Sequence, residues 1–301
     1  KPPTNMSIFQ KSVLNKYINN LDDATIDDAW QKYTTHFHNK AIQDNIKKSK
    51  EEQYQRGFLV DLFVNVLGYT INPEPNFNLT TELKNVKGAK KVDGAILDNG
   101  NAVAVIELKG MNTKDLAKVE SQAFGYKNNQ PHAVYVVTSN FQKLRFYIDK
   151  AIDFEAFNLF ELTKEQFKLL WLCLSKESLL QGIPKKIKEE SLTVEETITK
   201  KLYKDYSDFK NAIFNDLTTK NPTHNKLTLY KKTQKLLDRF LFIFFAEDKG
   251  LLPPNSIRAV LKQWNSLKDL DAYTPLYERY KKYFGYLNTG HKGKQHDIFA
   301  Y

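Results

Sequence analysis

The sequence predicts an α/β domain with a mixed central sheet flanked by helices, followed by an all-α domain. Two observations lead to this prediction. Between residues 77 and 148, apolar and polar residues alternate with the period of a strand, except in one helical segment. Before and after this region, the apolar residues recur with the period of a helix. Since the strands stop near residue 157, we expect two domains, 1–157 and 158–301.

Two helical regions precede the predicted strands. Residues 7–47 contain a long amphipathic stretch, and residues 49–69 contain a second helix that Gly68 closes. The sequence INPEPN at 71–76 is rich in turn-forming residues and predicts a loop. The chain therefore enters its sheet only after these helices.

Five segments have the alternation and the apolar content of strands. They are 77–83, 91–97, 102–108, 132–138 and 143–148. A helix from about Thr113 to Asn128 separates the third strand from the fourth. The order of helix, three strands, helix and two strands predicts an α/β unit with a mixed central sheet.

The second half of the chain contains helical patterns only. They cover 163–182, 193–217, 226–250, 256–267 and 275–287. The sequence GIPKKIKEES at 182–191 combines Gly, Pro and charged residues, and predicts a linker.

The positive charge is concentrated in this second half. The whole chain has a formal net charge of +10. Residues 1–160 carry 20 Lys and Arg against 18 Asp and Glu, whereas residues 161–301 carry 25 against 17. A basic region of this kind favours a polyanionic partner, most commonly nucleic acid.

Nothing in the sequence indicates a membrane partner or export. The longest apolar run, Phe240–Ala246, is too short to span a bilayer, and residues 1–10 contain no apolar signal region. The single cysteine, Cys173, cannot form an internal disulfide. We expect a cytoplasmic protein, and the lack of an initial Met predicts a piece of a longer chain.

Three charged residues lie in or next to two neighbouring strands. Asp93 is in the first strand, and Glu107 and Lys109 share one face of the second. Two carboxylates a few ångströms apart repel each other unless a divalent cation lies between them, and oxygen ligands favour Mg²⁺ or Mn²⁺. A lysine beside them can orient a water nucleophile and stabilise charge that develops on a phosphate. The three residues therefore predict metal-assisted phosphodiester hydrolysis.

The Asn-Gly turn between these strands conflicts with such a site. A plain two-residue turn would place Asp93 opposite Ile106, and Asp93 would then face away from Glu107. One extra residue in the hairpin restores the alignment, and bulges often redirect side chains beside active sites. We therefore predict an odd-length loop or a β-bulge between Ala95 and Ala104.

The hairpin resembles a known nuclease signature. Asp93 on one strand, with Glu107-Leu108-Lys109 on the next, resembles the pattern of the PD-(D/E)xK nuclease superfamily. The resemblance implies that Asp93 and Glu107 bind Mg²⁺, or Mn²⁺, and that Lys109 positions the hydrolytic water. Val92 stands where the name of the superfamily has Pro.

Two helices carry further residues that the resemblance implicates. QAFGY places Gln122 and Tyr126 on one helix face, similar to the Gln-xxx-Tyr element that lies near the active site of RecB-like and restriction-type members. The helix before the sheet contains EEQYQRGFLVD, whose spacing resembles restriction subunits. That spacing assigns Glu52 to the metal, with Glu51 as the alternative.

The helical part has a resemblance of its own. FLFIFFAEDKGLLPPN at 240–255 resembles the connector of type IIG bifunctional restriction–methylation enzymes, and HDIFAY at 296–301 resembles the approach to their methyltransferase domain. The chain has no Gly-rich AdoMet loop. NPEP at 72–75 and NPTH at 221–224 lack the second Pro and the aromatic residue of an N6-adenine methyltransferase. AdoMet binding is therefore expected only in a further C-terminal part.

We expect the nuclease and connector portion of a type IIG enzyme, a Mg²⁺-dependent type II site-specific deoxyribonuclease that acts on double-stranded DNA. Two alternatives stay open. One is a catalytically inactive, nuclease-like module that grips DNA or serves as a scaffold for an adenine-specific methyltransferase. The other is a nuclease of DNA repair or of a mobile element, and the residues that follow Tyr301 would separate it from the first.

Overall fold

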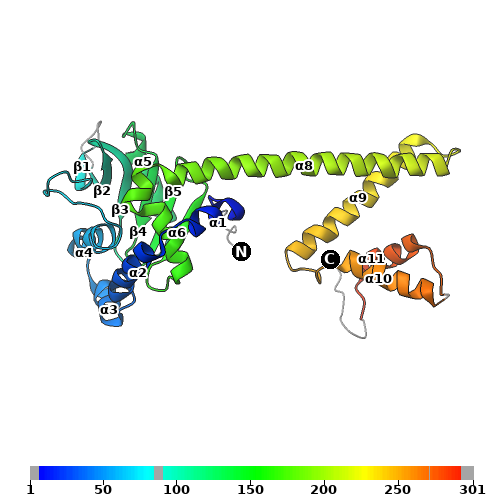
Figure 1. Cartoon of the computed structure of the whole chain (residues 1–301), viewed down its shortest axis with the longest axis horizontal. Coiled ribbons are helices and arrows are strands. Elements are labelled where there is room, and N and C mark those ends of the chain that lie inside the picture. Colours follow the sequence, from blue (N-terminus) through cyan, green and yellow to red (C-terminus); the bar gives the residue numbers. More distant parts are fainter. Residues whose placement is uncertain (1–6, 85–90, 271, 293–301) are drawn as a thin grey trace. The chain divides into compact units, whose positions relative to one another are not determined.

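A computed structural model describes residues 7–84, 91–270 and 272–292 of the chain, which divides into unit 1 (Lys1–Ile198) and unit 2 (Thr199–Tyr301). Unit 1 contains a six-stranded mixed sheet with helices around it, and the elements of unit 2 are helices (Figure 1). The predicted order of a mixed α/β region followed by a helical region is confirmed.

The elements have the following bounds. The helices before the sheet are α1 (Lys11–Asn19), α2 (Asp23–Phe37), α3 (Lys40–Lys48), α4 (Glu51–Phe58) and the π-helix η1 (Leu59–Val64). The strands are β1 (Leu79–Lys84), β2 (Lys91–Asp98), β3 (Asn101–Leu108), β4 (Tyr135–Ser139), β5 (Lys143–Ile148) and β6 (Phe154–Asn158), with α5 (Ala117–Asn128) between β3 and β4. The later helices are α6 (Lys164–Leu174), α7 (Lys176–Leu180), α8 (Ile183–Lys220), α9 (Lys226–Asp248), α10 (Ser256–Asp269) and α11 (Leu276–Thr289).

The six strands lie side by side in the order of the sequence. Neighbours are antiparallel except β3 and β4, which are parallel because α5 carries the chain back between them. The two faces of the sheet pack against different elements. Ile96 and Ile106 lie in the main core with the N-terminal helices, whereas Ala95 and Val105 lie in a smaller apolar cluster with α5.

The main core holds the N-terminal helices against the rest of unit 1. Tyr33 and Phe37 of α2 are fully buried with their rings 5.0 Å apart, and Phe167 of α6 lies 5.1 Å from Tyr33. The Tyr33 hydroxyl also donates a 2.5 Å hydrogen bond to the carbonyl of Leu159, just after β6. These contacts fix the helices that lead into α4, which begins beside the sheet.

The five predicted strands are confirmed as β1 to β5, and β6 is a strand that the sequence did not predict. It has five residues, and its Glu155 is buried. One oxygen of Glu155 accepts hydrogen bonds from Ser7 Oγ at 2.7 Å and from the Ile8 amide at 2.8 Å. Hydrogen bonds from the N-terminal segment therefore satisfy the buried carboxylate of Glu155. The alternation of polar and apolar residues around β6 gives no reason to expect this burial.

The linker predicted at 182–191 is wrong, because residues 183–191 form the first turns of α8. Pro184 lies in the first turn, where the missing amide hydrogen has no helical acceptor to bond. Ile187 and Ser191 of this segment are buried. The sheet ends at Asn158, near the predicted boundary at 157, whereas the division between the compact units falls later, within α8.

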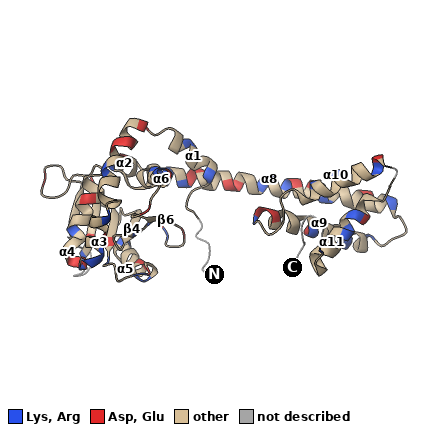
Figure 2. Ribbon diagram, turned by 90° about the horizontal axis from the view of Figure 1, so that it is seen from below, with Lys and Arg blue, Asp and Glu red and all other residues tan. Residues whose placement is uncertain are grey.

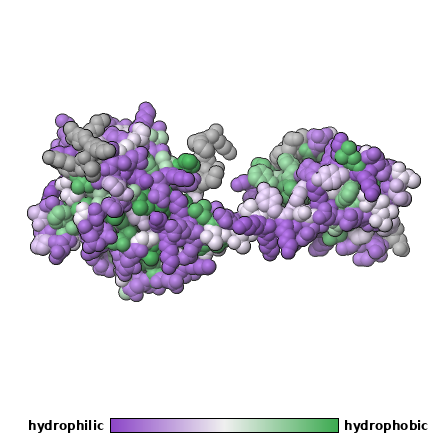
Figure 3. Space-filling view, turned by 90° about the horizontal axis from the view of Figure 1, so that it is seen from above, coloured by the Kyte–Doolittle hydropathy of each residue, from purple (hydrophilic) through white to green (hydrophobic). Residues whose placement is uncertain are grey.

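Unit 2 has a small apolar cluster made of Ile243, Ala246, Leu252, Tyr283 and Leu287. Other large apolar side chains of α9 are exposed: Leu241, Phe242, Phe244 and Phe245. On the face shown in Figure 3, hydrophobic residues are scattered among hydrophilic ones in both units. None of the helices in the described ranges combines the length and apolarity that crossing a bilayer requires. The segment HDIFAY at 296–301 lies outside the described residues.

Candidate active site

The β2–β3 hairpin sets the register of the site. Asn99 and Gly100 form the turn with positive φ angles of 48° and 80°, as the favoured two-residue hairpin turns require. Asp98 pairs with Asn101 next to the turn, but the register shifts between Ile96 and Leu97.

The shift leaves one residue of β3, Val103, without a partner on β2. Leu97 pairs with Ala102 and Ile96 pairs with Ala104, so the predicted bulge between Ala95 and Ala104 is confirmed. Beyond the bulge Gly94 pairs with Ile106. Asp93 precedes Gly94 on β2 and Glu107 follows Ile106 on β3. The two acids therefore lie opposite each other and share one face of the sheet.

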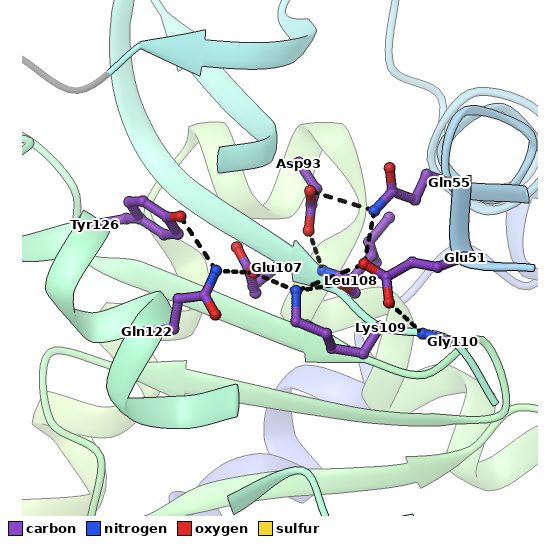
Figure 4. Close-up of polar contacts among 9 residues, drawn as sticks. All are labelled: Glu51, Gln55, Asp93, Glu107, Leu108, Lys109, Gly110, Gln122 and Tyr126. Carbon is purple, nitrogen blue, oxygen red and sulfur yellow. Dashed lines mark hydrogen bonds and ion pairs between the residues drawn. The ribbon is translucent and has the colours of Figure 1, made fainter. Parts of the chain in front are cut away.

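Glu107 is the most buried charged group of the site, with 1% of its surface exposed. Its Oε1 accepts hydrogen bonds from Lys109 Nζ at 2.6 Å and from Gln122 Nε2 at 2.5 Å (Figure 4). Its Oε2 is buried and has no hydrogen-bond partner among the described residues. Burial, reinforced by the nearby charges of Asp93 and Glu51, raises the pKa of Glu107 to about 7 although Lys109 opposes this shift.

Lys109 brings an ammonium group into the midst of several oxygens. Besides Glu107, its Nζ lies 3.0 Å from the carbonyl of Leu108 and 3.7 Å from Glu51 Oε1. Burial alone would lower the pKa of Lys109, but the surrounding carboxylates of Glu107, Asp93 and Glu51 hold it above its usual value. Lys109 therefore stays charged over the whole neutral range.

Asp93 faces the same patch from β2. Its Oδ2 accepts a 2.7 Å hydrogen bond from the Leu108 amide, which lies between Glu107 and Lys109 in the chain. Its Oδ1 accepts a 3.3 Å hydrogen bond from Gln55 Nε2 of α4. The hairpin and the helix thus both contact this carboxylate (Figure 4).

The structure places Glu51, and not Glu52, at the site. Glu51 Oε2 accepts a 2.8 Å hydrogen bond from the Gly110 amide, and its Oε1 accepts one of 3.3 Å from Gln55. Glu52 is exposed on another side of α4, because successive residues of a helix point about 100° apart. The choice of Glu52 from the sequence is therefore corrected to Glu51.

The first turn of α4 lies beside Gly110, just after β3. A Cβ atom on Gly110 would lie at an ordinary contact distance of 3.6 Å from the Cβ of Glu51 and only 3.1 Å from Asn112 Oδ1. A side chain at this position would therefore require the Asn112 side chain to shift, and would not displace α4.

The predicted pair on α5 is brought to the site as expected. Gln122 and Tyr126 lie one turn apart, and Gln122 Nε2 also donates a 3.1 Å hydrogen bond to the Tyr126 hydroxyl. Tyr126 is buried in the apolar cluster under α5. Its hydroxyl therefore helps to fix the Gln122 amide, which in turn contacts Glu107.

Gln55 is a site residue that sequence reasoning missed. It lies four residues after Glu51 and so on the same helix face, which was the available signal. Its amide nitrogen bridges Glu51 and Asp93, and thereby joins the helix to the first strand of the hairpin. The signal could be used only once Glu51, in place of Glu52, was known to face the sheet.

The donor set fits a hard divalent cation with few protein ligands. In the described parts of the chain, no three His, Cys, Asp or Glu side chains converge closely enough to form a metal cluster on their own. Mg²⁺, however, is often held by one or two carboxylates and keeps several water or phosphate oxygens. Asp93 and Glu107 supply two such carboxylates on one face, and an unpartnered buried oxygen of Glu107 fits this use.

Comparison with known protein families, with curated proteins and with solved structures finds no match for this chain. Function is therefore inferred from the geometry of the site.

Proposed function

We propose that unit 1 is a PD-(D/E)xK-type nuclease domain that hydrolyses phosphodiester bonds of double-stranded DNA with the help of Mg²⁺ or Mn²⁺. The observation that carries the proposal is the bulged hairpin, which puts Asp93, Glu107 and Lys109 on one patch in spite of its two-residue turn. A hairpin with a purely structural role has no need of an extra residue that aligns two acidic side chains.

Each residue of the patch has a distinct part in this proposal. Asp93 and Glu107 would hold the cation, which would supply Lewis-acid activation of the phosphate and of water. Lys109 donates to Glu107 and lies close to Glu51, so it can exchange these contacts for a water molecule or a phosphate oxygen. Its permanent charge then stabilises the negative charge that develops on the phosphate during attack.

The remaining polar residues keep this patch in place. Gln122 fixes Glu107 from α5, and Gln55 ties Asp93 to Glu51 of α4. Because three separate elements hold the carboxylates, their spacing persists when a substrate displaces Lys109. Rigid placement of this kind is what a site for an in-line displacement requires.

We further propose that the chain is the nuclease and connector portion of a cytoplasmic type IIG restriction enzyme, whose AdoMet-dependent part lies outside this sequence. Unit 2 would be the connector. The support is the resemblance of residues 240–255 to such connectors and the order of a mixed α/β unit followed by a helical unit.

The test is cleavage of long duplex DNA, such as plasmid or phage DNA, by the full chain in Mg²⁺, Mn²⁺ or EDTA. We expect cutting in either metal and none in EDTA. Glu107→Gln keeps the shape of the side chain and removes its charge, so it should reduce the rate on the order of 10³-fold. Glu52→Gln, one residue from Glu51 but exposed, is the matched control and should cut as the wild type does.

Two outcomes would contradict the proposal. Cutting by Glu107→Gln at the wild-type rate would show that the hairpin patch is not the active site. Metal-independent binding of DNA without any cutting would favour the inactive, nuclease-like scaffold.

A further inference from the structure

Thr138 of β4 lies directly beside Glu107 in the sheet. The parallel ladder between β3 and β4 pairs these two residues, and the next ladder pairs Thr138 with Arg145 of β5. Residues paired across a ladder point to the same face, so Thr138 faces α5 as Glu107 does. Neither side chain reaches solvent, with exposed fractions of 0% for Thr138 and 1% for Glu107.

These neighbours share a second property. Among the buried side-chain oxygens and nitrogens of the described residues, only Glu107 Oε2 and Thr138 Oγ1 have no hydrogen-bond partner. Buried polar groups are almost always hydrogen-bonded, and each exception calls for an explanation. One of the two atoms is a carboxylate acceptor and the other belongs to a hydroxyl donor, so each supplies what the other lacks.

The surroundings leave the Thr138 hydroxyl few other acceptors. On this face Val105 and Val136, two residues before Glu107 and Thr138, belong to the apolar cluster under α5. The carboxylate of Glu120, further along α5, already accepts from the Tyr147 hydroxyl at 2.9 Å. The free oxygen of Glu107, on the adjacent strand, is the complementary group.

We propose that Thr138 is a positioning residue of the site, whose hydroxyl donates a hydrogen bond to one buried water molecule that in turn donates to Glu107 Oε2. Contacts longer than a direct hydrogen bond are commonly bridged by water, and buried waters occupy polar positions of this kind. The inference rests on the proposed function only in taking Glu107 as an acid of the active site.

The bond gives Glu107 a defined orientation. Its Oε1 is held by Lys109 and Gln122, and support from Thr138 at one lone pair of Oε2 fixes the plane of the carboxylate and leaves the other lone pair for a cation. Partners that orient a metal-binding side chain typically change metal affinity 10–100-fold when they are removed. Loss of the Thr138 hydroxyl should therefore weaken metal binding even though Thr138 is not itself proposed as a ligand.

The experiment compares Thr138→Val, which keeps the shape of the side chain and loses the hydroxyl, with Thr138→Ser, which keeps the hydroxyl. Titration calorimetry of the full chain with Mn²⁺ alone gives the affinity without requiring catalysis. We expect about a tenfold weaker affinity for Thr138→Val and an affinity within about twofold of the wild type for Thr138→Ser. Thr233→Val is the control, because that buried hydroxyl of α9 already donates to the Leu229 carbonyl at 3.1 Å.

Should Thr138→Val not fold, Thr138→Ala takes its place in the titration. A second measurement needs no variant. A crystal structure of the metal-free wild type, at a resolution that places water molecules, should show one water molecule joining Thr138 Oγ1 to Glu107 Oε2.

The outcomes separate this inference from the proposed function. The predicted link in a chain that binds no Mn²⁺ would retain Thr138 as the partner of Glu107 and remove the metal site. A Thr138 hydroxyl bonded to a backbone carbonyl or to Gln122, or Thr138→Val with wild-type Mn²⁺ affinity, would overturn the inference whether or not the chain cuts DNA.

Discussion

The two units of this chain differ in where they put their charges. Unit 1 is nearly neutral, with 26 Lys and Arg against 25 Asp and Glu, and it buries charged and polar groups in a hydrogen-bonded hairpin site. Unit 2 carries 19 Lys and Arg against 10 Asp and Glu, and these charged residues are spread along its helices (Figure 2). It has only a small apolar cluster among its described residues. Under the proposed function, the chemistry would belong to unit 1, and unit 2 would contribute long-range attraction for a polyanion.

The largest expected effect on cleavage separates a lysine of the site, Lys109, from an exposed lysine of unit 2, Lys235. Lys109→Ala removes the ammonium group from the patch and should lower the cleavage rate on the order of 10³-fold while duplex DNA still binds. Lys235→Ala, on the exposed surface of α9, should leave the maximal cleavage rate unchanged. Rates at saturating enzyme measure both. Full cleavage by Lys109→Ala in Mg²⁺ would contradict the assignment of the chemistry to the hairpin site of unit 1.

A second prediction concerns the affinity of unit 2 for DNA. Lys231, Lys232 and Lys235 are exposed near the start of α9, and phosphate contacts release counterions. Replacing all three by Ala should weaken duplex binding by about 10–100-fold at low salt and reduce the slope of log affinity against log salt by up to about 3. Fluorescence anisotropy over a salt series measures both. An unchanged slope would make this part of unit 2 a purely structural connector.

The third prediction uses the buried acid of unit 1. The pKa of Glu107 rises from an ordinary 4.5 to about 7 on folding, so the folded state binds its proton more tightly. Its contribution to stability is therefore complete below about pH 4.5 and is lost as the pH rises through about 7. In EDTA, wild-type stability should fall more over this range than that of Glu107→Gln, by on the order of 2–3 kcal/mol.

Urea unfolding at pH 5 and pH 8 provides the measurement, and Glu52→Gln is the control that should follow the wild type. Parallel curves for wild type and Glu107→Gln would mean that Glu107 is not a buried, titrating acid. The same ionisation governs metal binding, because a carboxylate must lose its proton to become a ligand. Mg²⁺ affinity should accordingly rise with pH up to about 7 and then level off.

The smallest expected effect is on stability, and it tests whether the two units unfold separately. Gly125 of α5 and Gly285 of α11 lie inside helices, and a Cβ atom at either position would meet nothing within 4 Å. Replacing each by Ala should stabilise the protein by about 0.5–1 kcal/mol. If the units unfold separately, calorimetry should show that each substitution raises one transition only. Loss of stability from either change would contradict the packing described for that helix.

Much of this structure was predictable because the spacing of residues along the chain agrees with the faces that the tertiary structure buries. The alternation in β1 to β5 predicted these strands, and the need to bring Asp93 and Glu107 to one face predicted the bulge. The resemblance to the Gln-xxx-Tyr element singled out Gln122 and Tyr126, and helical spacing placed them on one face. In each case one periodicity, read locally, decided which side chains share a face.

The features that were missed depend on partners far away in the sequence. Glu155 is buried in β6 because Ser7 and Ile8 satisfy it, and no window around β6 contains that information. Glu51 and Glu52 differ only in the rotation of α4, which the packing of the whole helix against the sheet decides. The prediction of a linker at 182–191 failed for a related reason, because burial of Ile187 in the main core favours a helix there.

Because Val103 is unpaired, the deletion of one residue has different consequences for the site on β3 and on β2. Between the turn and the two acids, β3 contains one more residue than β2. A gene that loses codon 103 encodes a regular hairpin in which Asp93 still lies opposite Glu107. Loss of one codon from β2 between Asp93 and the turn doubles the mismatch, and a single bulge would then turn Asp93 away from its partner. Inherited deletions should therefore be tolerated on one strand of this hairpin and eliminated on the other.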